Sequence, residues 1–201
     1  GEIFKHVLET FKNIPNYNVK YKLIHAKDYG VPQNRPRILI IGICKDLSPK
    51  VNENDDALEN DFLPEPSYDY PHLKDVLSDL VDKKFEYGGE TKKYPSNPKN
   101  PWQENIRQGF ESNEMYLKGD LLTEHEYSNH SARVREKFGY MISNKGEIPE
   151  HLKTKKFAQR LLPKKWDDKG PTITTTSLPD DFVHFSQARS LTVREWARLQ
   201  T

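Results

Sequence analysis

The stretch YGVPQNRPRILIIGI, residues 29–43, places polar and cationic side chains directly before a long apolar run. Pro32 and Pro36 fix their own φ angles and bias the residues before them toward extended backbone, so the turn is predicted to be stiff. The run that follows is apolar on both faces, which is typical of a strand in a sheet covered on both sides. Arg35 and Arg37 are two residues apart and are expected to share one face. The sequence therefore predicts a stiff turn that presents guanidinium groups at the start of a core strand.

The arginine pair admits two interpretations. A guanidinium group presents a planar fork of donors that suits a phosphate or a base carbonyl. Two arginines at the end of a strand are also ordinary partners for nearby carboxylates. The turn, which also contains Gln33, leaves both interpretations open.

The composition describes a chain with a modest core and a large polar surface. Its 201 residues suffice for one domain or two small ones, with 34% hydrophobic and 30% charged residues. No apolar run approaches the roughly 20 residues of a membrane span, and the amphipathic start lacks the apolar segment of a secretory signal. The single cysteine, Cys44, excludes an internal disulfide and fits a reducing compartment.

Hydrophobic spacing predicts helices and strands that alternate at the start of the chain. Apolar residues at helical spacing predict a helix over residues 2–13, and apolar runs predict strands over 19–26 and 37–43. An amphipathic helix is expected within 70–81, before a stretch rich in turn residues. Further short helices are predicted at 102–110 and 131–138, and strands with a turn within 170–185.

A basic stripe with interleaved aromatic residues spans 153–169. Lysine neutralises phosphate and aromatic rings stack on bases, so the stripe suits a nucleic-acid backbone, although it can equally be a solvated face. The threonine run at 172–176 is similarly open, because hydroxyls bond to phosphates or base edges but threonine is also ordinary in strands. The candidates for nucleic-acid contacts are Lys155, Lys156, Arg160, Lys164, Thr172, Thr174 and Thr175.

The last segment carries the signals of a helix start. Thr192 and Glu195 have the spacing of a capping box, in which each side chain satisfies an orphan backbone N–H. Leu191 and Trp196 could form the accompanying hydrophobic staple. No helix stop signal precedes Thr201, so the sequence is expected to be truncated there.

The sequence offers no recognised metal or phosphate-loop motif. Its seven histidines show no HExxH spacing, and one cysteine excludes a thiolate zinc site. We therefore expect no metal and treat the histidines as structural or exposed.

Two blocks, in order, resemble a known family. AKDYGVPQNRPRILIIGI, residues 26–43, resembles the Q-x-R-x-R block of the cytosine-C5 DNA methyltransferases. ARSLTVREWARLQT, residues 188–201, resembles their R-x-L-T-x-R-E-x-x-R-L-Q block. Between them, WQENIR, SNH and RLLPKKWDDKGPTITTT resemble parts of the family's target recognition domain. The resemblance is close over both blocks and loose over most of the remainder.

The resemblance implies an α/β fold in two parts. One is the C-terminal part of a Rossmann-like methyltransferase sheet domain, and the other is a smaller, irregular, β-rich target recognition domain. Residues 1–80 would be the end of the catalytic domain, 81–187 the target recognition domain, and 188–201 a helix that returns to the catalytic domain.

The resemblance also implies a reaction. The family transfers a methyl group from S-adenosylmethionine to carbon 5 of a cytosine flipped out of duplex DNA, after a cysteine thiolate adds to carbon 6. Arg37 would donate to the carbonyl oxygen of the base, where charge develops, while Arg35 and Gln33 would hold the site. Thr172 would contact the DNA backbone. The residues expected to be structural, tying the two domains together, are Arg189, Thr192, Arg194, Glu195 and Gln200.

The family's Gly-rich cofactor loop, Pro-Cys nucleophile and Glu-Asn-Val block are not in the sequence, and Cys44 has no proline before it. We expect S-adenosylmethionine to be bound by a segment in the same parent chain or in a partner chain, and this piece to be inactive alone. Double-stranded DNA is the expected partner, and no membrane association is expected. The expected location is the cytoplasm of a bacterial or phage-type system, in association with the nucleoid. The expected biological role is restriction and modification. Two alternatives are a non-catalytic sequence-specific DNA-binding module and a fragment of an RNA cytosine methyltransferase.

Overall fold

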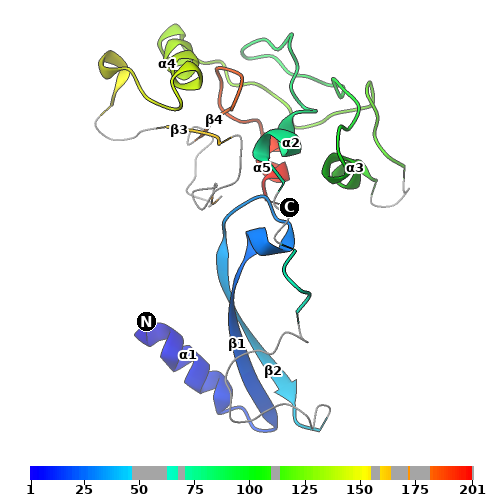
Figure 1. The fold of residues 1–201 in the computed structure, drawn as a ribbon, viewed down its shortest axis with the longest axis vertical. Helices are drawn as coiled ribbons and strands as arrows, with labels where there is room; N and C mark the ends of the chain where they lie inside the picture. The colour runs from blue at the N-terminus through cyan, green and yellow to red at the C-terminus, as the bar shows by residue number, and fades with distance from the viewer. Residues whose placement is uncertain are drawn as a thin grey trace.

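The computed structural model describes residues 1–46, 63–67, 71–109, 114–154, 159–163, 172 and 182–200. These residues form two lobes joined by a narrow neck (Figure 1). We call residues 1–46 the first lobe and the described residues from 71 onward the second lobe.

The first lobe is a helix packed on a long β-hairpin. Helix α1 (Glu2–Lys12) precedes β1 (Tyr17–His25) and β2 (Pro36–Cys44), which pair antiparallel along their full length. The turn between helix and hairpin places Asn16 at a φ of 66°. Helix α1 contacts the hairpin through Phe4, whose ring meets the Tyr21 ring edge-on at 5.1 Å, and its Leu8 is buried. The helix and both strands that the spacing predicts are confirmed, within two residues at each end.

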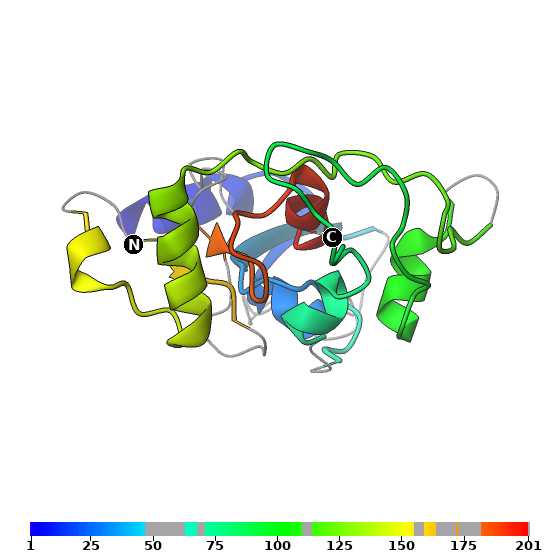
Figure 2. The ribbon, with the colours of Figure 1, turned by 90° about the horizontal axis from the view of Figure 1, so that it is seen from above.

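The second lobe is built mainly from short helices and loops. It contains α2 (Leu73–Leu77), α3 (Pro101–Arg107), α4 (Ala132–Ser143), the 3-10 helix η3 (Glu150–Leu152) and α5 (Val193–Arg198), with the two-residue strands β3 (Arg160–Leu161) and β4 (Phe182–Val183) paired in parallel. Seen from above, α4 and α3 lie at opposite ends of the lobe, with α2 and α5 between them (Figure 2).

One buried cluster joins distant parts of the second lobe. It combines residues of α2 and β4 with Leu162 and with the leucines on either side of α5, and Trp196 of α5 packs against it. Helix α2 lies near the end of residues 1–80, the range predicted to belong to the catalytic domain. In the structure it shares a core with the leucines that flank α5. The division of the chain at residues 80 and 187 stays a prediction.

Several element lengths differ from those predicted. Helix α2 covers five residues of the range 70–81, and α4 continues five residues beyond the predicted end at 138. Of the strands expected within 170–185, only β4 lies among the described residues. The covering predicted for both faces of β2 is incomplete in this chain, since Ile38 is 48% exposed.

Candidate nucleic-acid interface

The turn between β1 and β2 is closed by backbone hydrogen bonds. The 3-10 helix η1 (Ala26–Tyr29) follows β1 and ends at Gly30, whose φ of 80° lies in the left-handed region that glycine adopts without steric cost. The Ala26 N–H donates to the Arg35 carbonyl at 3.0 Å, and the Gln33 N–H donates to the Val31 carbonyl at 2.8 Å. Together with two prolines, these bonds support the stiffness that the sequence predicts.

The three polar side chains of this turn differ in exposure. Gln33 is buried, with 3% of its surface exposed, and Arg35 is half-buried. Arg37 is exposed at the start of β2, opposite Ile24, and its Nη1 donates to the Pro36 carbonyl at 2.7 Å. The turn therefore combines an inward-facing amide with a guanidinium at the surface.

Thr172 brings the second half of the chain to this turn. Its exposed hydroxyl donates to the Asn34 carbonyl at 2.6 Å. The Asn34 side chain lies against β1, with its Oδ1 3.3 Å from Nδ1 of His25. A predicted backbone-contacting threonine and the predicted arginine turn thus meet across 138 residues of sequence.

The other predicted contact residues divide into two groups. Arg160 is exposed on β3, and its guanidinium stacks over the Phe182 ring at 4.5 Å. The remaining candidates lie outside the described residues: Lys155, Lys156, Lys164, Thr174 and Thr175.

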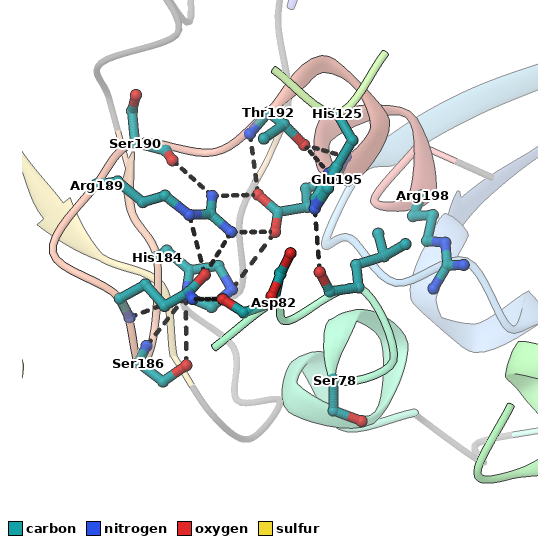
Figure 3. A network of polar contacts seen from close by, with 12 residues as sticks. Ser78, Asp82, His125, His184, Ser186, Arg189, Ser190, Thr192, Glu195 and Arg198 are labelled. Atoms are coloured by element: carbon teal, nitrogen blue, oxygen red, sulfur yellow. Dashed lines mark hydrogen bonds and ion pairs between the residues drawn. The ribbon is translucent and has the colours of Figure 1, made fainter. Parts of the chain in front are cut away.

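Arg189 and Glu195 form a buried ion pair in the second lobe (Figure 3). Two parallel bonds of 2.7 and 2.8 Å join the guanidinium to the carboxylate. The other Arg189 donors reach Gln187 Oε1 and the Ser190 carbonyl, so each of its five N–H groups has an acceptor. Glu195 also accepts from the Thr192 N–H, while the Thr192 hydroxyl accepts from the Glu195 N–H, which confirms the predicted capping box.

Two buried histidines, His125 and His184, lie beside the Arg189–Glu195 pair and are uncharged. His125 donates from Nε2 to the Leu80 carbonyl at 3.0 Å, and its Nδ1 accepts from the Thr192 hydroxyl at 2.8 Å. Nδ1 of His184 accepts from the backbone N–H groups of Ser186 and Gln187. Burial lowers the pKa of His125, and it lowers the pKa of His184 to about 3. His184 is therefore uncharged at neutral pH although its Nε2 lies 3.5 Å from Glu195.

Glu195 keeps its charge for the opposite reason. Burial alone would raise the pKa of its carboxyl, but the Arg189 guanidinium outweighs that effect and holds the pKa well below its usual range.

A second buried cluster escaped the sequence analysis. Asp79, after α2, accepts from Arg107 of α3 and from Arg198 of α5, and all three are buried. Arg107 also stacks on the Tyr94 ring at 3.9 Å. Arg107 is the last residue of the WQENIR segment, and Arg198 follows Trp196 by two residues. Their partner Asp79 lies 28 and 119 residues away in the sequence, so a short window does not reveal the pairing.

The remaining residues of the last block have simpler contacts. Arg194 donates from Nε to the Thr123 carbonyl at 2.9 Å, and Gln200 is exposed and bonded through its backbone to Ala197. Within the described ranges, no group of three His, Cys, Asp or Glu residues is arranged to hold a metal ion. No described helix combines the length and apolar character needed to cross a membrane.

Comparison with known proteins identifies the family. The family model for C-5 cytosine-specific DNA methylases matches residues 1–201. The chain belongs to this family. Its α/β fold class is also confirmed, since 99% of the chain superposes with a TM-score of 0.64 and 19% identity on a crystal structure of a candidate prophage-encoded DNA modification methyltransferase of E. coli, covering 55% of that chain.

Two relatives in this family are longer than the chain itself. It is 30% identical to the type II methyltransferase M.DdeI of Desulfomicrobium norvegicum over 97% of its own length and 46% of that protein. It is 29% identical to M1.HphI of Haemophilus parahaemolyticus over its full length and 43% of that protein. The chain thus spans about half the length of these relatives.

Proposed function

We propose that this chain is the DNA-recognising half of a cytosine-C5 DNA methyltransferase and supplies the arginine side of its active site. The reaction is methyl transfer from S-adenosylmethionine to carbon 5 of a cytosine flipped out of duplex DNA. One observation carries the proposal: the exposed Arg37 adjoins a closed turn with a buried Gln33, and Thr172 reaches the same turn.

Arg37 has the chemical property that this step requires. Addition of a thiolate to carbon 6 of cytosine moves electron density toward the ring carbonyl oxygen, where a fixed cation lowers the barrier. In this proposal Arg37 donates to that oxygen, and Arg35 and Gln33 hold its surroundings in place. The closed turn supports the assignment because a donor held in place before the reaction needs less reorganisation during it.

DNA contacts are proposed for the residues around this turn and for the basic and threonine-rich stretches of the second half. They include the two described residues Thr172 and Arg160, and the predicted residues Lys155, Lys156, Lys164, Thr174 and Thr175. Lysines there would neutralise phosphates, so the affinity of the chain for duplex DNA should fall as salt rises.

The chain's own residues do not fit S-adenosylmethionine. Its one Gly-Gly pair, Gly88-Gly89, packs in a turn where a Cβ on Gly88 would meet Asn129 Cβ at 3.2 Å, unlike a loop that opens onto a ligand. We therefore assign cofactor binding to residues outside this chain.

The exposed apolar surface of the first lobe also supports a catalytic domain that is completed by residues outside this chain. Ile3 is 82% exposed, and the other exposed large apolar residues of that lobe are Val7, Phe11, Ile14, Tyr17, Leu23 and Ile38. We propose that the remainder of the catalytic domain, which carries the nucleophile and the cofactor site, covers this surface, from the same polypeptide or from a partner chain. Type II relatives suggest a role in restriction and modification.

The decisive variant is Arg37→Ala in the protein that contains both the chain and the remaining catalytic segment. Methylation of duplex DNA should fall by about a hundredfold or more, with a much smaller loss of DNA affinity, because the bond to the base strengthens only as charge develops. Single-turnover methylation and equilibrium binding measure the two effects.

The matched control is Arg133→Ala, because Arg133 also donates to a backbone carbonyl from an exposed position, on α4. It should retain both properties. Equal losses of methylation and affinity in Arg37→Ala would remove the proposed role of that residue. Preference for tRNA over duplex DNA in a competition assay would redirect the whole proposal to RNA.

A further inference from the structure

Asn34 lies at a junction between the two halves of the chain. Its backbone carbonyl accepts the Thr172 hydroxyl at 2.6 Å, and its side-chain Oδ1 is 3.3 Å from His25 Nδ1. The residue after it, Arg35, has its own carbonyl held by the Ala26 N–H at 3.0 Å. Asn34 and Arg35 are thus contacted by residues of both lobes, Asn34 by Thr172 and His25 and Arg35 by Ala26.

The geometry limits how the backbone of Asn34 and Arg35 can move. Pro36 holds Arg35 in extended backbone, and His25 is paired with Pro36 at the end of the hairpin. While the bond from Thr172 to the Asn34 carbonyl is kept, a shift of Thr172 is transmitted to the segment that carries Arg35 and Arg37. If His25 releases the Asn34 side chain, the same segment loses its second support.

We propose that Thr172, Asn34 and His25 are positioning residues that couple the second half of the chain to the arginine turn. The inference rests on the proposed function, since the turn is taken as the arginine side of the active site. Thr172 fixes the backbone of Asn34, His25 fixes its side chain, and Asn34 between them sets the direction of both guanidinium groups. DNA contacts near Thr172 are thereby linked to the placement of the arginines.

This link acts on placement rather than on overall stability. The Thr172 hydroxyl and its bond are exposed, and an exposed hydrogen bond contributes little to folding because water replaces it. A small displacement of a positioned group nevertheless lowers the rate of a reaction strongly.

The test uses Thr172→Val, which removes the donor, and Thr172→Ser, which keeps it. The control is Thr10→Val, because Thr10 also donates from an exposed hydroxyl to a backbone carbonyl, that of His6 on α1. In the chain itself, NMR of arginine side-chain Nε–H groups should show shifted Arg35 and Arg37 signals in Thr172→Val but not in Thr172→Ser or Thr10→Val.

A second readout separates coupling from simple DNA contact. In the complete methyltransferase, Thr172→Val and His25→Phe should each lower the turnover rate by about tenfold, and His25→Gln, which can still donate, should restore it. The double variant should be no slower than the slower single variant, because both act through Asn34. Independent, multiplying losses would overturn the coupling.

The two proposals fail in different ways. Arginine signals in Thr172→Val that match those of Thr10→Val overturn this inference, even in a protein that methylates DNA. A wild-type enzyme that neither binds nor methylates duplex DNA overturns the proposed function, whatever the NMR signals show.

Discussion

Arg189 and Glu195 illustrate what a single residue contributes inside the second lobe. Each is fully buried, and each has its charge satisfied by the other and by neighbouring polar groups. Removal of one partner leaves the other charge in a region that water does not reach, which costs far more than the pair contributes when intact. The stability of the last block therefore depends on the match between the Arg189 and Glu195 charges.

Glu195→Gln is expected to destabilise the chain by about 3–5 kcal/mol, because it leaves the Arg189 guanidinium buried without a counter-charge. Urea denaturation followed by circular dichroism measures the loss. Glu150→Gln, at an exposed pair with Lys153, is the control and should leave the urea midpoint unchanged. A midpoint for Glu195→Gln equal to that of the control would contradict the structural role of the pair.

The lowered pKa of His184 makes the free energy of unfolding depend on pH. Its pKa is about 3 in the folded chain and 6.5 in its ordinary state, so the unfolded chain binds more protons below about pH 6.5. The free energy of unfolding should therefore fall as pH drops below that value, by up to about 1.4 kcal/mol per pH unit from this group. The lowered pKa of His125 acts in the same direction.

Urea titrations at several pH values between neutral and moderately acidic check this dependence. His184→Asn, which keeps an acceptor near the Ser186 and Gln187 N–H groups, should flatten the slope. His72→Asn, at an exposed histidine, should not change it. An unchanged slope in His184→Asn would show that other groups cause the acid sensitivity.

At the scale of elements, α5 shows how a short helix is stabilised. Six residues are too few for an isolated helix, so α5 depends on its cap and on packing. Leu191 is buried in the main cluster and Trp196 packs against it, so both members of the predicted staple meet the same core. The N-terminal cap, Thr192, also satisfies His125, and the helix start is thereby tied to a loop 67 residues earlier.

Thr192→Ala should cost about 1–2 kcal/mol from the lost cap, with a further loss because Nδ1 of buried His125 has no donor left. Thermal unfolding measures the effect, and Thr192→Ser should recover most of it. Ser131→Ala is the control, since Ser131 occupies the N-cap of α4 without a side-chain cap bond. A loss at Thr192 as small as that at Ser131 would mean that neither the cap bond nor the bond to His125 adds stability.

At the scale of the whole molecule, the two lobes differ in how well they are closed. The second lobe buries its apolar residues in a shared cluster, whereas the amphipathic helix α1 buries only Leu8 and exposes Ile3, Val7 and Phe11. Exposed apolar area of this kind is typical of a surface that is covered in an assembly.

Ile3→Asp and Phe11→Asp should reduce the self-association and hydrophobic-dye binding of the isolated 201-residue chain. In the complete methyltransferase the same variants should be destabilising, because there the face is proposed to be covered. Val193→Asp, at an apolar residue 63% exposed on the second lobe, is the control. Sedimentation, dye fluorescence and thermal unfolding measure the three effects, and no difference from the control would remove the covered-face proposal.

The sequence by itself determined the elements whose signals are local. The spacing of apolar residues in α1, the two strand runs and the capping box at Thr192 depend on neighbours within one or two turns, so they can be read from a short window. The same holds for the stiff proline-flanked turn and for the family, which rests on two nearly continuous blocks.

Only the tertiary structure decided which distant residues meet. The partnership of Asp79 with Arg107 and Arg198, the neutral state of His125 and His184, and the bond from Thr172 to Asn34 join segments far apart in the chain. Local patterns carry no information about such pairs, because burial and charge matching arise only when separate segments exclude water together.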